Sequence, residues 1–229
     1  MGPQNLPDRI CEVQKQIAQA CAAAGRTADS VTLLAVGKGQ PPAVLASAAD
    51  CGLRDFGESY LQEALGKLAA LQERALRWHF IGRVQANKTR PIAEHFAWVH
   101  TLDRLKIAER LSAQRPYHAA PLNVCLEVSL AGESSKGGVT PAQLPQLAQA
   151  VAALPRLKLR GLMCLPPAEA DPQRQRAWFR ALRGLKEALN AGGGELDTLS
   201  MGMSGDFPAA IAEGATIVRL GTVLFGPRA

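Results

Sequence analysis

The sequence lacks paired cysteines and any spacing typical of a metal site. Its 229 residues contain an odd number of cysteines, none in a Cys-x-x-Cys pair, namely Cys11, Cys21, Cys51, Cys125 and Cys164. We expect these to be reduced, small, buried side chains, as is usual for cytoplasmic proteins. The four histidines fall in no metal-ligand pattern, which argues against a structural zinc site.

Signals for membranes and for secretion are also absent. No apolar run approaches the roughly 18 residues of a transmembrane helix. The N-terminal stretch MGPQNLPDRI has no hydrophobic signal-peptide segment, and Leu6 stands where a myristoylation site needs Ser or Thr. We therefore predict a soluble, cytoplasmic protein with no membrane partner.

Aromatic residues are scarce, and the charges are scattered. The chain has three Trp, two Tyr and six Phe, and its 26 Lys and Arg exceed its 20 Asp and Glu without any run of like sign. A nucleic-acid-binding domain typically gathers basic residues on one face. We predict no nucleic-acid partner, whereas a basic balance suits small anionic ligands.

What the sequence does contain is a regular alternation of apolar runs and helical patterns. A helical pattern over 7–24 comes first. Eight apolar runs follow, at 31–38, 54–59, 76–82, 97–102, 123–130, 159–166, 197–204 and 216–221. Helix-like stretches separate them, at 42–52, 60–73, 86–96, 103–114, 141–154, 172–192 and 206–214. Strands that alternate with helices favour parallel pairing.

Eight such units predict an α/β fold: a single (β/α)8 TIM barrel domain over residues 1–229, with an extra N-terminal helix. The alternative is an open, doubly wound sheet. That fold commonly carries a glycine-rich GxGxxG turn after its first strand, and none follows the run at 31–38. The closed barrel is therefore the favoured prediction.

A lysine ends the first predicted strand. The functional residues of such barrels lie at the carboxyl ends of the strands, so Lys38 in LLAVGK is expected to point into the barrel mouth. Apolar walls there favour a neutral amine, which forms Schiff bases with aldehydes. A solvated or salt-bridged lysine on a loop is the alternative.

The last two predicted strands end in sequences suited to phosphate. SMGMSGD supplies the hydroxyls of Ser200 and Ser204, and RLGT supplies Gly221 and Thr222. Barrels often bind phosphate in the loops after strands seven and eight. Asp206 is expected to cap the next helix, whose N–H groups favour an anion. Ordinary turn and capping chemistry is the alternative interpretation.

A lysine for aldehyde chemistry beside a phosphate site points to one cofactor, pyridoxal 5′-phosphate (PLP). Arg219 lies two residues before Gly221 and is expected to face the same mouth. Its guanidinium is a suitable donor for the pyridine nitrogen of PLP. An ion pair at the barrel rim is the alternative for this arginine.

Longer motifs carry a resemblance to a known family. LLAVGK, FGESYLQEALGK, WHFIGRVQANK, SKGGV, LRGLMCLP and TLSMGMSGDFPAAIAEGATIVRLGTVLFG resemble the YggS/PROSC family of PLP homeostasis proteins, from about residue 30 onward. The resemblance implies an alanine-racemase-type barrel (PLP fold type III) that carries PLP as an internal aldimine on Lys38. It also implies that Arg219 meets the pyridine nitrogen and that the phosphate is bound by Ser200, Ser204, Gly221 and Thr222.

Two positions depart from the family pattern. Gly37 precedes the lysine where the family usually has Ser or Thr, and Ser59 replaces the asparagine of Phe-Gly-Glu-Asn. Ser59 is thus a candidate cofactor contact with a shorter reach. Lys136 in SKGG is a candidate second amine for PLP. His79 and Asn87 are candidates for the mouth, with a core histidine and a helix-capping asparagine as the alternatives.

Two classes of function remain, a PLP carrier and a PLP-dependent amino-acid racemase. A two-base racemase needs a second proton donor opposite the lysine, which the racemase relatives take from a tyrosine of an extra domain. The tyrosines here, Tyr60 and Tyr117, fall at a helix start and in a polar loop. Arg219 would leave the pyridine nitrogen unprotonated, because a guanidinium keeps its proton.

We therefore predict a monomeric, non-catalytic PLP-binding protein that acts in intracellular PLP homeostasis. Its ligands are expected to be PLP and related B6 vitamers, and its protein partners to be apo-enzymes that receive PLP. A racemase or related PLP enzyme is the alternative.

Overall fold

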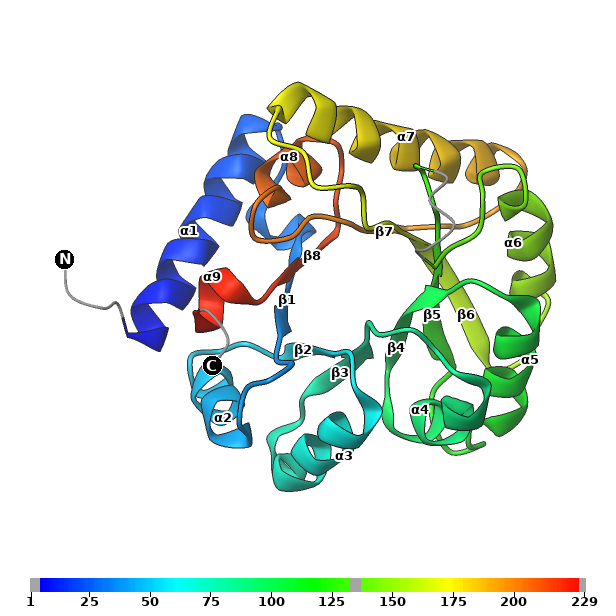
Figure 1. Ribbon diagram of the computed structural model, residues 1–229, viewed down its shortest axis with the longest axis horizontal. Helices are drawn as coiled ribbons and strands as arrows, with labels where there is room; N and C mark the ends of the chain where they lie inside the picture. Colours follow the sequence, from blue (N-terminus) through cyan, green and yellow to red (C-terminus); the bar gives the residue numbers. More distant parts are fainter. Residues whose placement is uncertain (1–4, 132–136, 227–229) are drawn as a thin grey trace.

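Eight parallel strands close into a barrel in the computed structural model, which describes residues 5–131 and 137–226 (Figure 1). The strands follow chain order, and β1 pairs with β8 to complete the ring. Their bounds are β1 Thr32–Val36, β2 Asp55–Glu58, β3 Arg77–Phe80, β4 Trp98–Leu102, β5 Leu122–Glu127, β6 Leu157–Met163, β7 Thr198–Ser200 and β8 Ile217–Leu220. The barrel prediction is confirmed, and the doubly wound sheet is excluded because that sheet has two open edges.

Helices surround this barrel in the order that the alternating pattern predicts (Figure 1). Their bounds are α1 Leu6–Ala23, α2 Pro42–Asp50, α3 Leu61–Ala70, α4 Thr89–His95, α5 Leu105–Gln114, α6 Leu144–Ala152, α7 Pro172–Ala191, α8 Phe207–Ala212 and α9 Thr222–Phe225. The short helix α9 was not predicted, since its four residues are too few to show a helical period.

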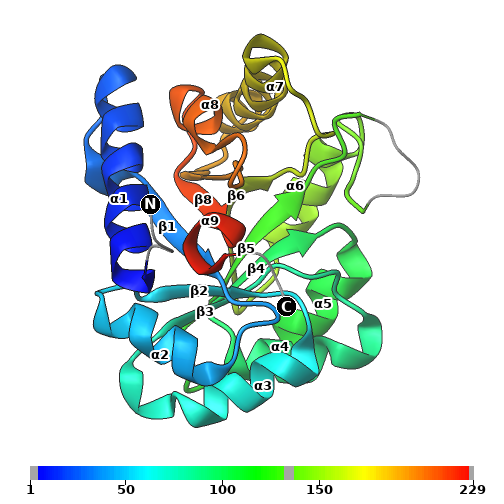
Figure 2. The same ribbon diagram turned by 60° about the vertical axis from the view of Figure 1, so that its left-hand side comes forward.

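The N-terminal helix α1 packs beside β1 and against α8 and α9 (Figure 2). Asn5 caps it by accepting a hydrogen bond from the backbone N–H of Asp8 at 2.9 Å. Arg9 donates through Nε to the carbonyl of Leu224 at 2.6 Å, which ties α1 to α9. One face is buried, formed by Ile10, Val13, Ile17 and Cys21. This helix therefore covers the seam where β1 meets β8.

The two faces of each strand meet different surroundings. Side chains alternate along a strand, so one set packs outward against the helices and the other fills the barrel. Phe56 and Phe80 belong to the apolar packing and are almost fully buried. The interior is unusual because it includes buried polar groups, His79 and His100 among them. Bulky aliphatic side chains dominate the interior of most such barrels.

The cysteines are all unpaired, but they are not all buried. Cys21, Cys125 and Cys164 are buried, Cys51 is half-buried and Cys11 is exposed. The prediction of burial is therefore wrong for Cys11 and only partly right for Cys51. Burial raises the pKa of the Cys125 and Cys164 thiols to about 12, so these two stay protonated and unreactive.

Across the described ranges, none of the helices combines the length and the apolar character needed to cross a bilayer.

Candidate functional site

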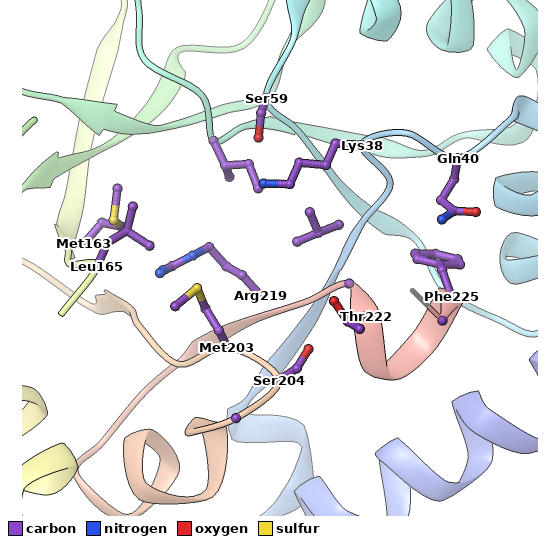
Figure 3. Close-up of a pocket in the computed structure, with 15 residues that line it drawn as sticks. Lys38, Gln40, Ser59, Met163, Leu165, Met203, Ser204, Arg219, Thr222 and Phe225 are labelled. Carbon is purple, nitrogen blue, oxygen red and sulfur yellow. The ribbon is translucent and has the colours of Figure 1, made fainter. Parts of the chain in front are cut away.

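A pocket of about 300 Å³ opens at the carboxyl ends of the strands (Figure 3). Its polar lining comes mainly from the ends of β1, β2, β7 and β8. Six of the seven predicted site residues line it, namely Lys38, Ser59, Ser204, Arg219, Gly221 and Thr222. Apolar side chains complete the walls, among them Val36, Ile81, Met163 and Phe225.

Charged and hydroxyl groups occupy different parts of this pocket. In Figure 3 the charged ends of Lys38 and Arg219 lie toward one end, and the hydroxyls of Ser204 and Thr222 lie toward the other. An elongated ligand with an electrophilic or acceptor-rich ring and an anionic tail would match both ends. Pockets of this kind, apolar with few convergent polar groups, are typical of cofactor sites.

Lys38 stands on a tight turn two residues beyond the end of β1. The carbonyl of Gly37 accepts from the backbone N–H of Gln40 at 2.9 Å, and Gly39 between them has a positive φ of 76°. Glycine adopts that conformation without the cost that other residues meet. The GKG sequence thus lets the chain reverse so that the Lys38 side chain enters the pocket.

Helix α3 holds this turn from behind. Lys67 is 3% exposed, and its Nζ donates to the Gly37 carbonyl at 2.7 Å, to Glu58 at 2.8 Å and to Glu63 at 2.5 Å. Glu63 also accepts from the backbone N–H of Gly39 at 2.6 Å. The turn that carries Lys38 is therefore fixed on both sides by one network, which centres on the buried Lys67. We name these three side chains, Glu58, Glu63 and Lys67, the turn clamp.

Glu58 is the least satisfied member of the turn clamp. Its side chain is fully buried, and among the described residues its Oε2 has no hydrogen-bond partner. Burial raises the pKa of Glu58 to about 7, although the hydrogen bond and charge of Lys67 oppose the shift. A Cβ at Gly37 would approach Glu58 Oε1 to 2.7 Å, so glycine at this position fits closely against the clamp.

The hydroxyl end of the pocket is formed by the loops after β7 and β8. Ser204 and Thr222 bring their hydroxyls there, and Gly205 leaves the space beside its backbone open. Asp206 stands at the N-cap position of α8, as predicted, but its side chain accepts no hydrogen bond from that helix. Its carboxylate instead accepts from the backbone N–H of Met203 at 2.5 Å, which folds the loop back on itself.

Arg219 is held tightly at the other end. Its Nη1 donates to the Ser200 carbonyl at 2.6 Å and to the Ser200 hydroxyl at 2.9 Å, and its Nη2 donates to the Cys164 carbonyl at 2.9 Å. Within the described ranges, Nε and the second Nη2 hydrogen have no acceptor. Burial lowers the pKa of Arg219 from its ordinary value. Two donor positions thus stay available to a ligand acceptor.

Ser200 is the predicted site residue that the pocket does not include. It is fully buried in the barrel, where its hydroxyl contacts His100 Nδ1 at 2.7 Å and accepts from Arg219. Ser200 therefore lies beneath Arg219, away from the hydroxyls of Ser204 and Thr222. The sequence analysis predicted Ser200 as a phosphate ligand where the seventh strand runs into its loop, and in the structure Ser200 is the last residue of β7 itself.

The weaker candidates fall in different places. His79 is buried and hydrogen-bonded through both ring nitrogens, which confirms the core-histidine interpretation. Asn87 is exposed and does not cap α4, so the capping interpretation is wrong. Tyr60 and Tyr117 are 65% and 94% exposed, and neither lines the pocket. Lys136 lies outside the described residues.

Sequence comparison relates the chain to proteins named for one cofactor. Residues 14–229 match the family model described as alanine racemase, N-terminal domain. A pyridoxal phosphate homeostasis protein of Pseudomonas aeruginosa is 58% identical over 223 residues, covering 97% of this chain and 96% of the relative. The protein of that name from Escherichia coli K12 is 46% identical over 227 residues, covering 98% and 97%.

Structural comparison also relates the chain to a PLP-binding protein. PipY of Synechococcus elongatus PCC7942, solved with PLP bound, is 35% identical with a TM-score of 0.86, covering 97% of this chain and all of that one. The alanine racemase of Corynebacterium glutamicum is 18% identical with a TM-score of 0.69, covering 96% of this chain but only 61% of the racemase. The second similarity concerns the fold alone.

Proposed function

Because this chain belongs to the pyridoxal phosphate homeostasis proteins, within the wider alanine racemase N-terminal domain family, we propose that it binds PLP and serves intracellular PLP homeostasis without catalytic turnover. The observation that carries this proposal is the division of the pocket. Lys38 and Arg219 lie toward one end, and the hydroxyls of Ser204 and Thr222 lie toward the other. PLP supplies a reactive aldehyde, an acceptor ring nitrogen and an anionic phosphate, one for each of these groups.

The proposal assigns each polar side chain of the pocket a contact with PLP. The Lys38 amine would hold the cofactor as a Schiff base with its aldehyde, whose oxygen would leave as water. Arg219 donates from Nε or Nη2 to the ring nitrogen, and these donors have no other acceptor within the described part of the chain. Ser204 and Thr222 donate their hydroxyls to the phosphate. Ser59 contacts the cofactor on the side of Lys38, as its place in the pocket allows.

The same geometry disfavours a racemase. A guanidinium that donates to the ring nitrogen leaves this nitrogen unprotonated. The cofactor ring then accepts electrons from a substrate carbanion less readily. A second base is needed on the opposite face of the substrate. Tyr60 and Tyr117 do not line the pocket. We propose storage and release of PLP as the role, with apo-enzymes as recipients, a monomeric state and a cytoplasmic location as predictions from the sequence.

We expect no racemisation of alanine. In heavy water, each enantiomer incubated with the PLP-loaded protein should exchange its Cα proton no faster than with free PLP, because the unprotonated ring stabilises the carbanion only weakly. It should not invert, because no second base delivers a proton to the opposite face. Proton NMR follows the exchange, with an alanine racemase as the positive control. Exchange with inversion at ~1 s⁻¹ or faster, the low end of ordinary enzymes, would overturn the non-catalytic assignment.

The phosphate should supply much of the affinity. Ser204→Ala and Thr222→Ala are each expected to weaken PLP binding by about 1–3 kcal/mol, the range for a hydrogen bond to a charged group. Pyridoxal, which lacks the phosphate, should bind far less well than PLP and should not distinguish the variants from wild type. Equilibrium titration followed by absorbance measures both. Equal affinity for PLP and pyridoxal would contradict the assignment of these loops, and no binding of PLP would contradict the proposed function itself.

A further inference from the structure

A file of buried polar side chains crosses the interior of the barrel beneath the pocket. It begins at Asp55 on β2, continues through His79 on β3 and His100 on β4, and reaches Ser200 on β7 and Arg219 on β8. None of these five residues is more than 7% exposed, although they lie up to 164 positions apart in the sequence. We name them the interior relay.

Each step of the interior relay is a hydrogen bond of ordinary length. The His79 Nε2 lies 3.0 Å from Asp55 Oδ1, and the His79 Nδ1 lies 3.0 Å from His100 Nε2. His100 Nδ1 lies 2.7 Å from the Ser200 hydroxyl, which lies 2.9 Å from Arg219 Nη1. Buried polar groups cost free energy unless they are hydrogen-bonded, and every member here has its partner.

The proton positions along the relay follow from its two ends. A guanidinium has donors only, so Arg219 donates to Ser200, and two neutral rings that end on the Asp55 carboxylate, which only accepts, require the Ser200 hydroxyl to give its own proton to His100 Nδ1. His100 then carries its proton on Nε2 and donates to His79 Nδ1. His79 in turn donates from Nε2 to the carboxylate of Asp55, which is an acceptor only. Every hydrogen bond thus points from the arginine toward the aspartate.

Charge explains why this direction is stable. Arg219 is buried with no carboxylate within hydrogen-bond distance among the described residues, which is costly for a cation. At one end of the relay the Ser200 hydroxyl accepts from Arg219, and at the other end His79 donates to Asp55. Asp55 also accepts two hydrogen bonds from Arg77, at 2.7 and 2.8 Å. Burial lowers the pKa of both His79 and His100, so two neutral rings fit between the charges.

We infer that His100 is a positioning residue for the ligand site. Through Ser200 it orients the Arg219 guanidinium, so that its remaining donors face the pocket. The relay itself follows from the geometry of the protein alone. Its effect on the ligand rests on the proposed function, since PLP is the ligand whose ring nitrogen Arg219 would meet.

The proton arrangement is tested first in the protein without added ligand. Nitrogen-15 NMR of the imidazoles should show His79 and His100 as neutral rings with the proton on Nε2, throughout pH 6 to 8. The exposed His118, which lies outside the relay, serves as the reference ring in the same spectra. A proton on Nδ1 of His100, or a charged ring at either position, would overturn the relay whatever the protein binds.

Two substitutions of His100 then test the effect on the ligand. His100→Gln keeps one acceptor and one donor and should behave as wild type. His100→Phe leaves the Ser200 hydroxyl without an acceptor and should weaken PLP binding by about threefold to tenfold, as expected for one hydrogen bond. His118→Gln is the matched control on the surface.

The visible band of the PLP-loaded protein separates positioning from simple loss of stability. A guanidinium that lies farther from the ring repels the positive charge of the protonated Schiff base less. The Schiff base should therefore keep its proton to higher pH. The pH midpoint of the band should therefore rise in His100→Phe and stay at the wild-type value in His100→Gln. Wild-type affinity and midpoint in a folded His100→Phe protein would overturn the positioning role. Failure of the wild-type protein to bind PLP would instead contradict the proposed function and leave the NMR result standing.

Discussion

Replacing Lys38 with alanine is expected to abolish covalent attachment of PLP. The wild-type protein loaded with PLP should absorb at ~420 nm, the usual region for a protonated Schiff base of PLP with a lysine. Lys38→Ala should lose this band completely, because no other lysine in the described ranges lines the pocket. The phosphate contacts of Ser204 and Thr222 remain, so PLP should still bind reversibly with a spectrum like that of the free aldehyde.

Reduction with borohydride identifies the lysine that carries PLP. Borohydride reduces the Schiff base to a stable secondary amine, and peptide mapping by mass spectrometry should then place the phosphopyridoxyl group on Lys38. Lys106→Ala, an exposed lysine on α5, is the matched control and should label as wild type. A wild-type protein that stays colourless after incubation with PLP, or carries the label on Lys136 alone, would contradict the assignment of Lys38.

The second large effect concerns stability. Lys67→Met should lower the free energy of unfolding by about 3–5 kcal/mol at pH 8, the range for removing one partner of a buried ion pair. The reason is that the buried Glu58 carboxylate loses the ion pair and hydrogen bond of Lys67, while its Oε2 has no hydrogen-bond partner among the described residues. Urea denaturation measures the change. Lys106→Met, on the surface of α5, should leave the free energy of unfolding within about 0.5 kcal/mol of wild type.

The pH dependence of this effect has a definite sign. Burial raises the pKa of Glu58 from an ordinary 4.5 to about 7 in the folded protein. Between these values the folded state binds more protons than the unfolded chain, so Glu58 makes the free energy of unfolding fall as the pH rises. Without Lys67 the fall should extend above pH 7, because the hydrogen bond and charge that oppose the shift are gone. The loss in Lys67→Met should therefore be smaller at pH 5 than at pH 8.

A double substitution distinguishes an unpaired charge from lost packing. Glu58→Met combined with Lys67→Met replaces both charges by apolar side chains and should recover most of the stability lost in Lys67→Met. The double variant should still bind PLP more weakly than wild type, because the Gly37 carbonyl and the Lys38 turn lose their anchor. Wild-type stability in Lys67→Met would show that the turn clamp does not hold the fold together.

The sequence by itself determined the architecture and most of the pocket. Apolar runs that alternate with helical patterns specify parallel strands with crossover helices, and eight such units close a barrel. The fold then brings together every strand end on one face. Lys38, Ser204, Gly221 and Thr222 follow strand ends directly in the chain, so their meeting at the mouth could be predicted.

Only the tertiary structure decided what lies beneath that mouth. Alternation along a strand assigns a face, but two positions along a strand differ in depth by about 7 Å. Ser200 is the last residue of β7 and is fully buried, whereas Ser204 lies four residues later, in the loop at the pocket. The hydrogen bond between His100 and Ser200 joins residues 100 positions apart, and Lys67 reaches Gly37 across 30. Such contacts depend on barrel register and on how α3 packs against β2, which no local pattern of residues specifies.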